Sequence, residues 1–434
     1  MRYFLVLFIA FLSLSAKAQQ SEIVDFTSVY AELDLRTNQS QQVVASVDYT
    51  FDILKSTDSI YLDAKGVMVD YSSLNSKIIK IYNDDNKLWI KSEFKPSKNN
   101  KLKLHYKVNP KKAMYFVDKA TSYQIWTQGQ GKYTSHWLPS IDDMNDKIVF
   151  DLSIAADKGY QVIANGVHNG ELSQKEANLW FYKMQKPMSS YLVALAIGKY
   201  DKRVITSKSG IPIELYYYPE DSLKVEPTYR YTKQLFDFLE DEIGVPYPWQ
   251  NYKQVPVKDF LYSGMENTSC TIFSDDFMVD DISFVDKNYV NVNAHELAHQ
   301  WFGDLVTETS GTHHWLQEGF ATYYALLAER DVFGDDYYYW RLYEYVQELI
   351  TQENAGEGTK LLDPKSSSTT FYKKGAWVLH MLKEQVGEQA FKKAIKNYLN
   401  AYAFKNVETN NFIVEVEKAS GKDLTVFVNT WLLS

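Results

Sequence analysis

The chain has 434 residues, of which 45% are hydrophobic and 23% are charged, proportions that exclude a disordered or collagen-like protein. The length predicts more than one domain, because single hydrophobic cores stop growing at about 250–300 residues. Acidic residues outnumber basic ones, for a formal net charge of −9, which argues against nucleic acid or an anionic membrane surface as a partner.

Residues 1–18 have the three parts of a secretory signal peptide. Arg2 supplies the positive charge, Tyr3 to Ser15 form the apolar run, and Ala16-Lys17-Ala18 is a small-x-small cleavage site. The alternative, a retained membrane anchor, is disfavoured because a spanning helix needs roughly 18 or more apolar residues, and no later segment approaches that length. We therefore expect export to the periplasm or the medium, a mature chain that begins at Gln19, and no membrane span in it.

Between Ile23 and Tyr200, short runs rich in β-branched and aromatic residues, such as KLKLHYKV and VFDLSIAA, are separated by turn clusters such as NDDN and KPSKNN. This pattern is typical of antiparallel β-structure. We expect a β domain over residues 19–212.

Near Val225 the spacing of apolar residues changes to that of helices, first in VEPTYRYTKQLFDFLEDEIG. Longer helical patterns follow in WLQEGFATYYALLAERDVF, YYYWRLYEYVQELI and FYKKGAWVLHMLKEQVG. A mainly α domain over residues 213–434 is expected, which makes the chain a multidomain α+β protein. Cys270, the only cysteine, lies in the apolar run TSCTIF and is interpreted as a packed, inert thiol.

His295, Glu296 and His299 form the pattern H-E-x-x-H. On a helix, positions i and i+4 share one face, so both imidazoles can bind one zinc ion while Glu296 lies beside them as a base. The alternative is a pair of core or solvent-facing histidines. Since zinc lowers the pKa of its water, Glu296 can accept a proton as a peptide carbonyl is attacked and pass it to the departing nitrogen.

A catalytic zinc ion usually has three protein ligands and an open position. Glu318 opens the helical pattern WLQEGFATYY and is the candidate third ligand. A solvated surface carboxylate is the alternative, but the apolar and small residues around Glu318 disfavour it. His136, His313 and His314 are interpreted as supporting or surface groups.

Further motifs surround this pattern: Gly264-Met265-Glu266-Asn267 before it, and Trp315 to Ala321 and Tyr372 to Ala376 after it. In their order and spacing they resemble the M1 family of zinc aminopeptidases. The resemblance implies a saddle-like β domain followed by a thermolysin-like, mainly α catalytic domain. It also implies one Zn²⁺ per chain, held by His295, His299 and Glu318, and peptide substrates with a free N-terminus.

The same resemblance assigns roles to residues that the spacing alone does not single out. It implies that Glu266, with Gln130 from WTQGQGKYTSHWLPSIDD, binds the substrate's α-amine, and that Tyr372 stabilises the oxyanion. It further implies that Gly264, Met265 and Asn267 contact the substrate main chain. Without the family, Glu266 is better interpreted as a structural carboxylate at a strand edge.

The chain departs from the family pattern in two places. Gln317 stands where relatives commonly have Asn, and the resemblance ends at NTWLLS, without the helical domain that normally follows; a cleft that is more open, or covered by another subunit, is expected. Two alternatives stay open. A thermolysin-like zinc endopeptidase is disfavoured by G-M-E-N, and a non-catalytic scaffold is disfavoured by the complete set of site residues.

Overall fold

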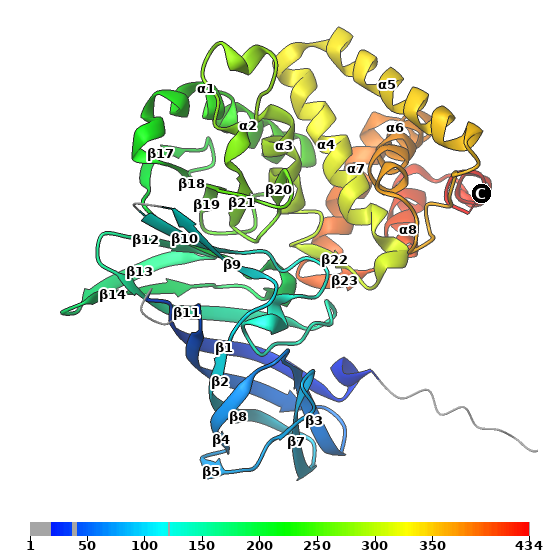
Figure 1. Cartoon of the computed structure of the whole chain (residues 1–434). Helices are drawn as coiled ribbons and strands as arrows, with labels where there is room; N and C mark the ends of the chain where they lie inside the picture. The colour runs from blue at the N-terminus through cyan, green and yellow to red at the C-terminus, as the bar shows by residue number, and fades with distance from the viewer. Residues whose placement is uncertain (1–18, 37–40, 120–121, 434) are drawn as a thin grey trace, which may run out of the picture.

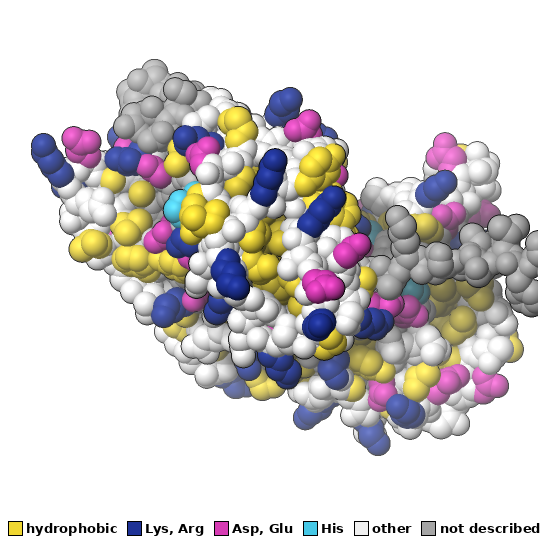
Figure 2. Space-filling model, turned by 90° about the horizontal axis from the view of Figure 1, so that it is seen from below, with side chains coloured by type: hydrophobic (Ala, Val, Ile, Leu, Met, Phe, Trp, Pro, Cys, Tyr) yellow, Lys and Arg dark blue, Asp and Glu magenta, His cyan; other side chains and the backbone are white. Residues whose placement is uncertain are grey.

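The computed structural model describes residues 19–36, 41–119 and 122–433, so the predicted signal peptide, residues 1–18, lies outside the described part. A β-rich domain forms one end of the molecule and a mainly helical domain the other (Figure 1), which confirms the expected α+β class. Within these ranges, no helix is both long enough and apolar enough to cross a membrane. Seen from the β-rich end, Lys and Arg side chains are scattered among acidic and apolar ones (Figure 2).

The β-rich domain is built on a nine-stranded sheet. Along β2 (Val43–Ile53), buried side chains alternate strictly with half-buried ones, as expected of a strand with one face on a core. β1 (Val24–Asp34) pairs antiparallel with β2 but parallel with β11 (Lys147–Asp157), so the prediction of a purely antiparallel sheet is corrected. Strand alternation cannot reveal this pair, because parallel strands are joined by a long crossover rather than a hairpin.

The main path of the sheet runs β13-β14-β11-β1-β2-β8-β4-β5, with β15 paired to β11. Its other strands are β4 (Met68–Leu74), β5 (Lys77–Ile78), β8 (Ser97–Val108), β13 (Val167–Ser173), β14 (Ala177–Lys183) and β15 (Met188–Ser189). Two smaller sheets complete the domain: β3 (Thr57–Asp63), β7 (Lys87–Phe94) and β6 (Tyr82–Asn83); and β12 (Gln161–Ala164), β16 (Leu195–Gly198), β10 (Ser122–Thr127) and β9 (Met114–Lys119).

A five-stranded sheet, in the order β17-β18-β19-β21-β20, opens the second domain. Its strands are β17 (Asp201–Thr206), β18 (Pro212–Tyr217), β19 (Tyr252–Val257), β20 (Gly264–Met265) and β21 (Cys270–Ser274). The predicted boundary after residue 212 falls inside β18, whose neighbour β17 begins at Asp201 and belongs to the same sheet. The strand pattern simply continues across this point, so the sequence does not mark the change of sheet. Cys270 is fully buried, as expected, and burial raises the pKa of its thiol to about 12.

The helices of the second domain surround α4 (Trp315–Phe333), in which every residue from Trp315 to Glu329 is buried. The other helices are α1 (Val225–Tyr229), α2 (Thr232–Ile243), α3 (Val290–His299), α5 (Asp335–Asn354), α6 (Gly375–Val386), α7 (Glu388–Ala401), α8 (Thr409–Ser420) and α9 (Thr425–Trp431). A π-helical turn, η9 (Thr370–Lys374), precedes α6, and β22 (Val306–Glu308) pairs with β23 (Lys405–Val407).

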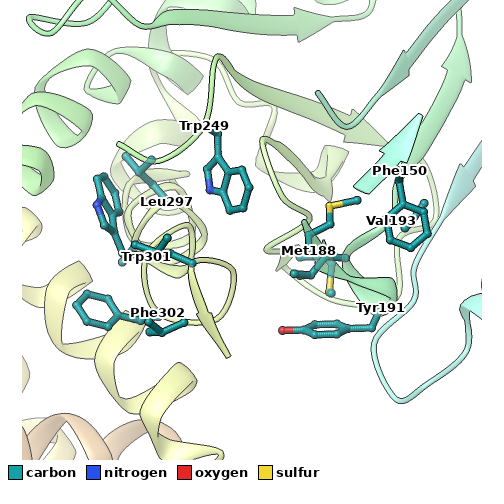
Figure 3. Packing of buried hydrophobic residues seen from close by; sticks show 14 of the residues in the cluster. Phe150, Met188, Tyr191, Val193, Trp249, Leu297, Trp301 and Phe302 are labelled. Atoms are coloured by element: carbon teal, nitrogen blue, oxygen red, sulfur yellow. The ribbon is translucent and has the colours of Figure 1, made fainter. Parts of the chain in front are cut away.

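One apolar core joins the two domains. Figure 3 shows Met188 and Tyr191 of the β-rich domain on one side and Trp249 and Leu297 of the helical domain on the other. Polar contacts reinforce the junction, since the Asn165 side-chain amide donates to the carbonyl oxygen of Thr268 at 2.7 Å. The segment that follows β20 is thereby fixed against the β-rich domain.

Candidate active site

The three predicted zinc ligands meet between α3 and α4. His295 Nε2 lies 3.0 Å from His299 Nε2, and each of these nitrogens lies 3.3 Å from Glu318 Oε2. Ligand atoms bound to a tetrahedral zinc ion at about 2.0–2.1 Å lie roughly 3.3 Å from one another. The spacing of these three atoms therefore fits a single zinc ion.

Neighbouring groups orient the ligands for a metal ion. His299 Nδ1 lies 2.8 Å from the carbonyl oxygen of Phe302, and donation to that oxygen leaves Nε2 free to bind a cation. His314 bridges two carboxylates, with Nδ1 3.1 Å from Glu308 and Nε2 3.5 Å from Glu318. Burial opposes charge on Glu318, but the nearby imidazoles of His299 and His295 hold its pKa well below the usual range. The predicted supporting role of His314 agrees with this placement.

Glu296 points into the same space. Its Oε2 is buried and has no hydrogen-bond partner among the described residues, and burial raises its pKa well above the ordinary value. Strand β20 passes so close that a Cβ on Gly264 would lie 2.5 Å from Glu296 Oε1. A larger residue at position 264 would push the Glu296 side chain out of this position, which gives a physical reason for the glycine that begins the G-M-E-N motif.

Glu266 lies close to both His299 and Glu296. One oxygen of Glu266, one of Glu296 and a nitrogen of His299 all lie within 4.8 Å of one another. The side chain of Glu266 is 3% exposed, and its Oε1 has no hydrogen-bond partner in the described ranges. Burial raises the pKa of Glu266. The interpretation as a strand-edge structural carboxylate does not account for this unpaired oxygen beside the predicted metal ligands.

Tyr372 is held at the site by two glycines. Its ring stacks on that of His295, with centroids 5.5 Å apart and planes at 5°. A Cβ on Gly319 would lie 2.9 Å from Gly375 Cα, and one on Gly375 would lie 2.8 Å from Gly319 Cα. The residue after Glu318 thus touches the backbone that follows η9, and π-helical turns of this kind are frequent at functional sites. Burial and the carboxylates of Glu318 and Glu266 raise the pKa of Tyr372.

The site opens into a cavity of about 630 Å³. The predicted residues that line it are Gln130, Gly264, Glu266, His295, Glu296, His299, Glu318 and Tyr372. Met265 and Asn267 do not line it, and their contact with the substrate main chain stays a prediction. Met265 is buried in the core beside the amide of Gln128. The Asn267 amide donates to the carbonyl oxygen of Leu192 at 3.3 Å, so this segment contacts the β-rich domain.

Several lining residues are absent from the sequence-based prediction. Asn291 and Thr322 line the cavity one helical turn from His295 and Glu318, so helical spacing could have identified them. Arg341 and Tyr345 come from α5 and carry no motif. Their place at the cavity depends on how α5 packs, which no local pattern shows. The remaining newly found lining residues are Tyr262, Ser263, Val292, Ser368 and Lys373.

Gln317 departs from the family pattern, and both polar atoms of its side chain are hydrogen-bonded within the protein. Its Oε1 accepts from the backbone N–H of Glu308 at 3.0 Å, and its Nε2 donates to the Tyr191 hydroxyl at 3.2 Å. Gln317 therefore links α4, directly before Glu318, to β22 and to the β-rich domain.

Comparison with known proteins places these features in a family. The Peptidase family M1 domain matches residues 228–431 and the Peptidase M1 N-terminal domain matches residues 27–192. The glutamyl aminopeptidase of Sus scrofa is 30% identical over 68% of this chain, and probable aminopeptidase 1 of Sulfurisphaera tokodaii is 27% identical over 86%. The chain spans 33% and 50% of the lengths of these two relatives.

The fold has a counterpart among solved structures. A mutant of an M1 zinc metallopeptidase from Deinococcus radiodurans superposes with a TM-score of 0.81 at 20% identity, covering 94% of both chains. The match extends over both domains of the chain. With the two domain models in the same order along the sequence, the chain belongs to peptidase family M1.

Proposed function

We propose that the protein is an exported zinc aminopeptidase that hydrolyses the first peptide bond of substrates with a free N-terminus. The observation that carries the proposal is the buried carboxylate of Glu266, whose Oε1 has no hydrogen-bond partner among the described residues and which lies within 4.8 Å of Glu296 and His299, beside the predicted zinc ligands. A carboxylate fixed there favours an ammonium group and closes that end of the cavity to longer chains. Residues 1–18, with their signal-peptide pattern, support export.

His295, His299 and Glu318 would hold one zinc ion per chain, which would supply Lewis-acid polarisation of the peptide carbonyl and acidify a water molecule. In its carboxylate form, Glu296 accepts the proton of the attacking water on its unpaired oxygen, for which its raised pKa makes it the stronger base, and delivers the proton to the departing nitrogen. The Tyr372 hydroxyl, kept protonated by its raised pKa, donates a hydrogen bond to the developing oxyanion. Glu266 and Gln130 receive the substrate's ammonium group.

Relatives support the same activity. Both glutamyl aminopeptidase and probable aminopeptidase 1 carry this activity in their names, and the Deinococcus metallopeptidase has been solved with the substrate Tyr-Ser-Ala. An aminopeptidase requires a group that recognises the free amine. Among the described residues that line the cavity, three have carboxylates, and Glu266 is the one that is neither a predicted zinc ligand nor the predicted base.

The test is hydrolysis by the mature protein of a panel of aminoacyl-arylamides and matched N-acetylated peptides. Each reaction is run with and without a chelator, followed by restoration with zinc. We expect cleavage of the free-amine substrates only, loss with the chelator, and recovery with about one zinc ion per chain. Glu266→Gln should raise KM for free-amine substrates far more than Gln130→Ala does, because Glu266 carries the charge.

Other outcomes would replace the proposal. Internal cleavage of N-acetylated peptides would establish an endopeptidase, and zinc binding without cleavage of any substrate would indicate a scaffold. Sequencing of the secreted or periplasmic protein tests export separately, since the proposal requires an N-terminus at Gln19.

A further inference from the structure

The cavity has two chemically distinct ends. At the carboxyl end of α3, the Gln300 side chain donates to the backbone oxygen of Glu266 at 3.2 Å, so the acidic end lies there. At the amino end of α3, the Asn291 amide donates to Glu329 near the end of α4 at 2.9 Å. The zinc triad lies between these ends. If Glu266 binds the substrate's amine, the part of the peptide that leaves extends toward Asn291 and α5.

Arg341 of α5 lines the cavity. Burial opposes the charge of its guanidinium, but Tyr345 and the carboxylate of Glu329 lie close enough to raise its pKa. Because Glu329 also accepts from Asn291, Arg341 lies at this second end. Its Nη1 donates to Glu344 at 2.5 Å, in a pair whose side chains are 32% and 39% exposed, and such pairs contribute little to stability. Its Nε is buried and has no hydrogen-bond acceptor among the described residues. The guanidinium therefore has donor capacity that the fold does not use, and an unpaired buried donor is costly in the absence of a ligand.

A second cation lies beside it. Both charged groups lie near the ring of Tyr345: the guanidinium carbon of Arg341 is 5.5 Å, and the ammonium nitrogen of Lys373 5.4 Å, from the ring centroid. Lys373 and Tyr345 also line the cavity, and Lys373 pairs with Glu348, which is half exposed. The carboxylates that neighbour the two cations do not line the cavity, so among the described residues the charged lining groups at this end are Arg341 and Lys373, where the other end presents Glu266.

We propose that Arg341, assisted by Lys373, binds a carboxylate on the leaving part of the substrate. The carboxylate is either the C-terminus of a short peptide or an acidic side chain beyond the cleaved bond, because both present the planar group that a guanidinium binds with paired hydrogen bonds. The inference rests on the proposed aminopeptidase function and adds a preference for short or acidic peptides to it.

The experiment compares four free-amine substrates: Leu-Ala, Leu-Ala-amide, Leu-Glu-amide and leucine p-nitroanilide. Each is measured with the zinc-loaded protein and with its Arg341→Gln variant. Arg330→Gln is the matched control, because Arg330 is 34% exposed, pairs with Asp335 and does not line the cavity. We expect Arg341→Gln to lower kcat/KM for the substrates that carry a carboxylate by about tenfold, mainly through KM, with the p-nitroanilide changed less than about twofold.

The substrate arms identify the source of the carboxylate. A loss confined to Leu-Ala assigns the site to the peptide C-terminus, and a loss confined to Leu-Glu-amide assigns it to an acidic side chain. An equal loss on all four substrates, or no loss on any, overturns the inference while leaving the aminopeptidase reaction intact.

A binding measurement separates this failure from failure of the proposed function. Calorimetric titration of the Glu296→Gln protein with Leu-Ala-Ala and with its C-terminal amide measures binding without turnover. The peptide with the free carboxylate should bind with the lower Kd, and the added substitution Arg341→Gln should abolish this difference. If the unchanged protein cleaves no free-amine substrate and the Glu296→Gln protein binds neither peptide, the proposed function falls and this inference with it.

Discussion

Two buried tyrosines of the core packed on β1 and β2 differ from two buried glutamates of the cavity between α3 and α4 in whether their oxygen atoms have hydrogen-bond partners. In the β core the hydroxyl of Tyr106 donates to the carbonyl oxygen of Trp137 at 2.9 Å, and that of Tyr49 donates to Pro139. In the cavity, Glu266 and Glu296 each keep a buried oxygen without a partner in the described ranges. An unsatisfied buried group costs about 1–3 kcal/mol, so the two cavity glutamates lower stability until a ligand pairs with them, whereas the two tyrosine hydroxyls carry no such cost.

Glu296→Gln is expected to have the largest effect and tests this contrast directly. Losing the proton acceptor should lower kcat/KM for a leucine arylamide about 10³-fold. The free energy of unfolding should stay equal or rise, because a neutral amide replaces a buried carboxylate with an unpaired oxygen. Steady-state kinetics and urea unfolding measure both. The exposed Glu384→Gln is the control, and a marked loss of stability in Glu296→Gln would contradict the comparison.

Phe26→Ala should show the opposite behaviour. Phe26 is fully buried and packs against Tyr49 and Phe51, with ring centroids 5.6 Å and 5.3 Å away. Its truncation should cost about 3–5 kcal/mol of unfolding free energy, while kcat/KM at low temperature changes less than about twofold. Tyr30→Ala, on the same strand but 36% exposed, should cost much less. A catalytic defect in folded Phe26→Ala protein would show that the two regions are not separable.

Gly375→Ala asks whether backbone contact alone positions Tyr372. The new Cβ would lie 2.8 Å from Gly319 Cα, so α4 and the backbone after η9 must separate and carry Tyr372 away from His295. We expect kcat to fall by up to about 10²-fold, the lower end of the loss that follows removal of an oxyanion donor. Gly311→Ala is the control, since its Cβ would make an ordinary 3.7 Å contact with Pro364. Equal activities of the two variants would rule out this positioning role.

The smallest expected effect concerns Asp142, a largely buried carboxyl near the junction of the domains. Burial, with Asp63 nearby, raises its pKa from 3.8 to about 6 in the folded protein. Between these values the folded state holds a proton that the unfolded state has lost, so the contribution of Asp142 to stability falls as the pH rises from about 4 to 6. Asp142→Asn should remove this fall.

The free energy of unfolding of the unchanged protein and of Asp142→Asn, measured across pH 3.5–8, tests this expectation. At neutral pH the Asn variant should be more stable by roughly 1–3 kcal/mol, a gap that narrows at acidic pH. A constant difference across the whole range would mean that the pKa of Asp142 is the same in the folded and unfolded states.

Local sequence was sufficient for the elements and for the ligand-bearing helices. The helical pattern WLQEGFATYYALLAERDVF corresponds residue for residue to α4, and H-E-x-x-H lies on α3 as its spacing predicts. Both are properties of a single element, in which the period of the chain fixes which side chains share a face. The boundary near residue 212 was not predictable in this way, because β17 and β18 have the pattern of ordinary strands in either domain.

The sequence by itself determined the α+β class, the succession of strands and helices, and the residues able to hold zinc, since these follow from local periodicity and residue chemistry. Tertiary structure alone decided that Gly264 touches Glu296, that Gly319 touches Gly375, and that Asn267 faces the β-rich domain rather than the cavity. It also brought Arg341 of α5 to the cavity wall. These contacts join segments far apart in the chain, and the packing of whole elements, rather than any local preference, sets their distances.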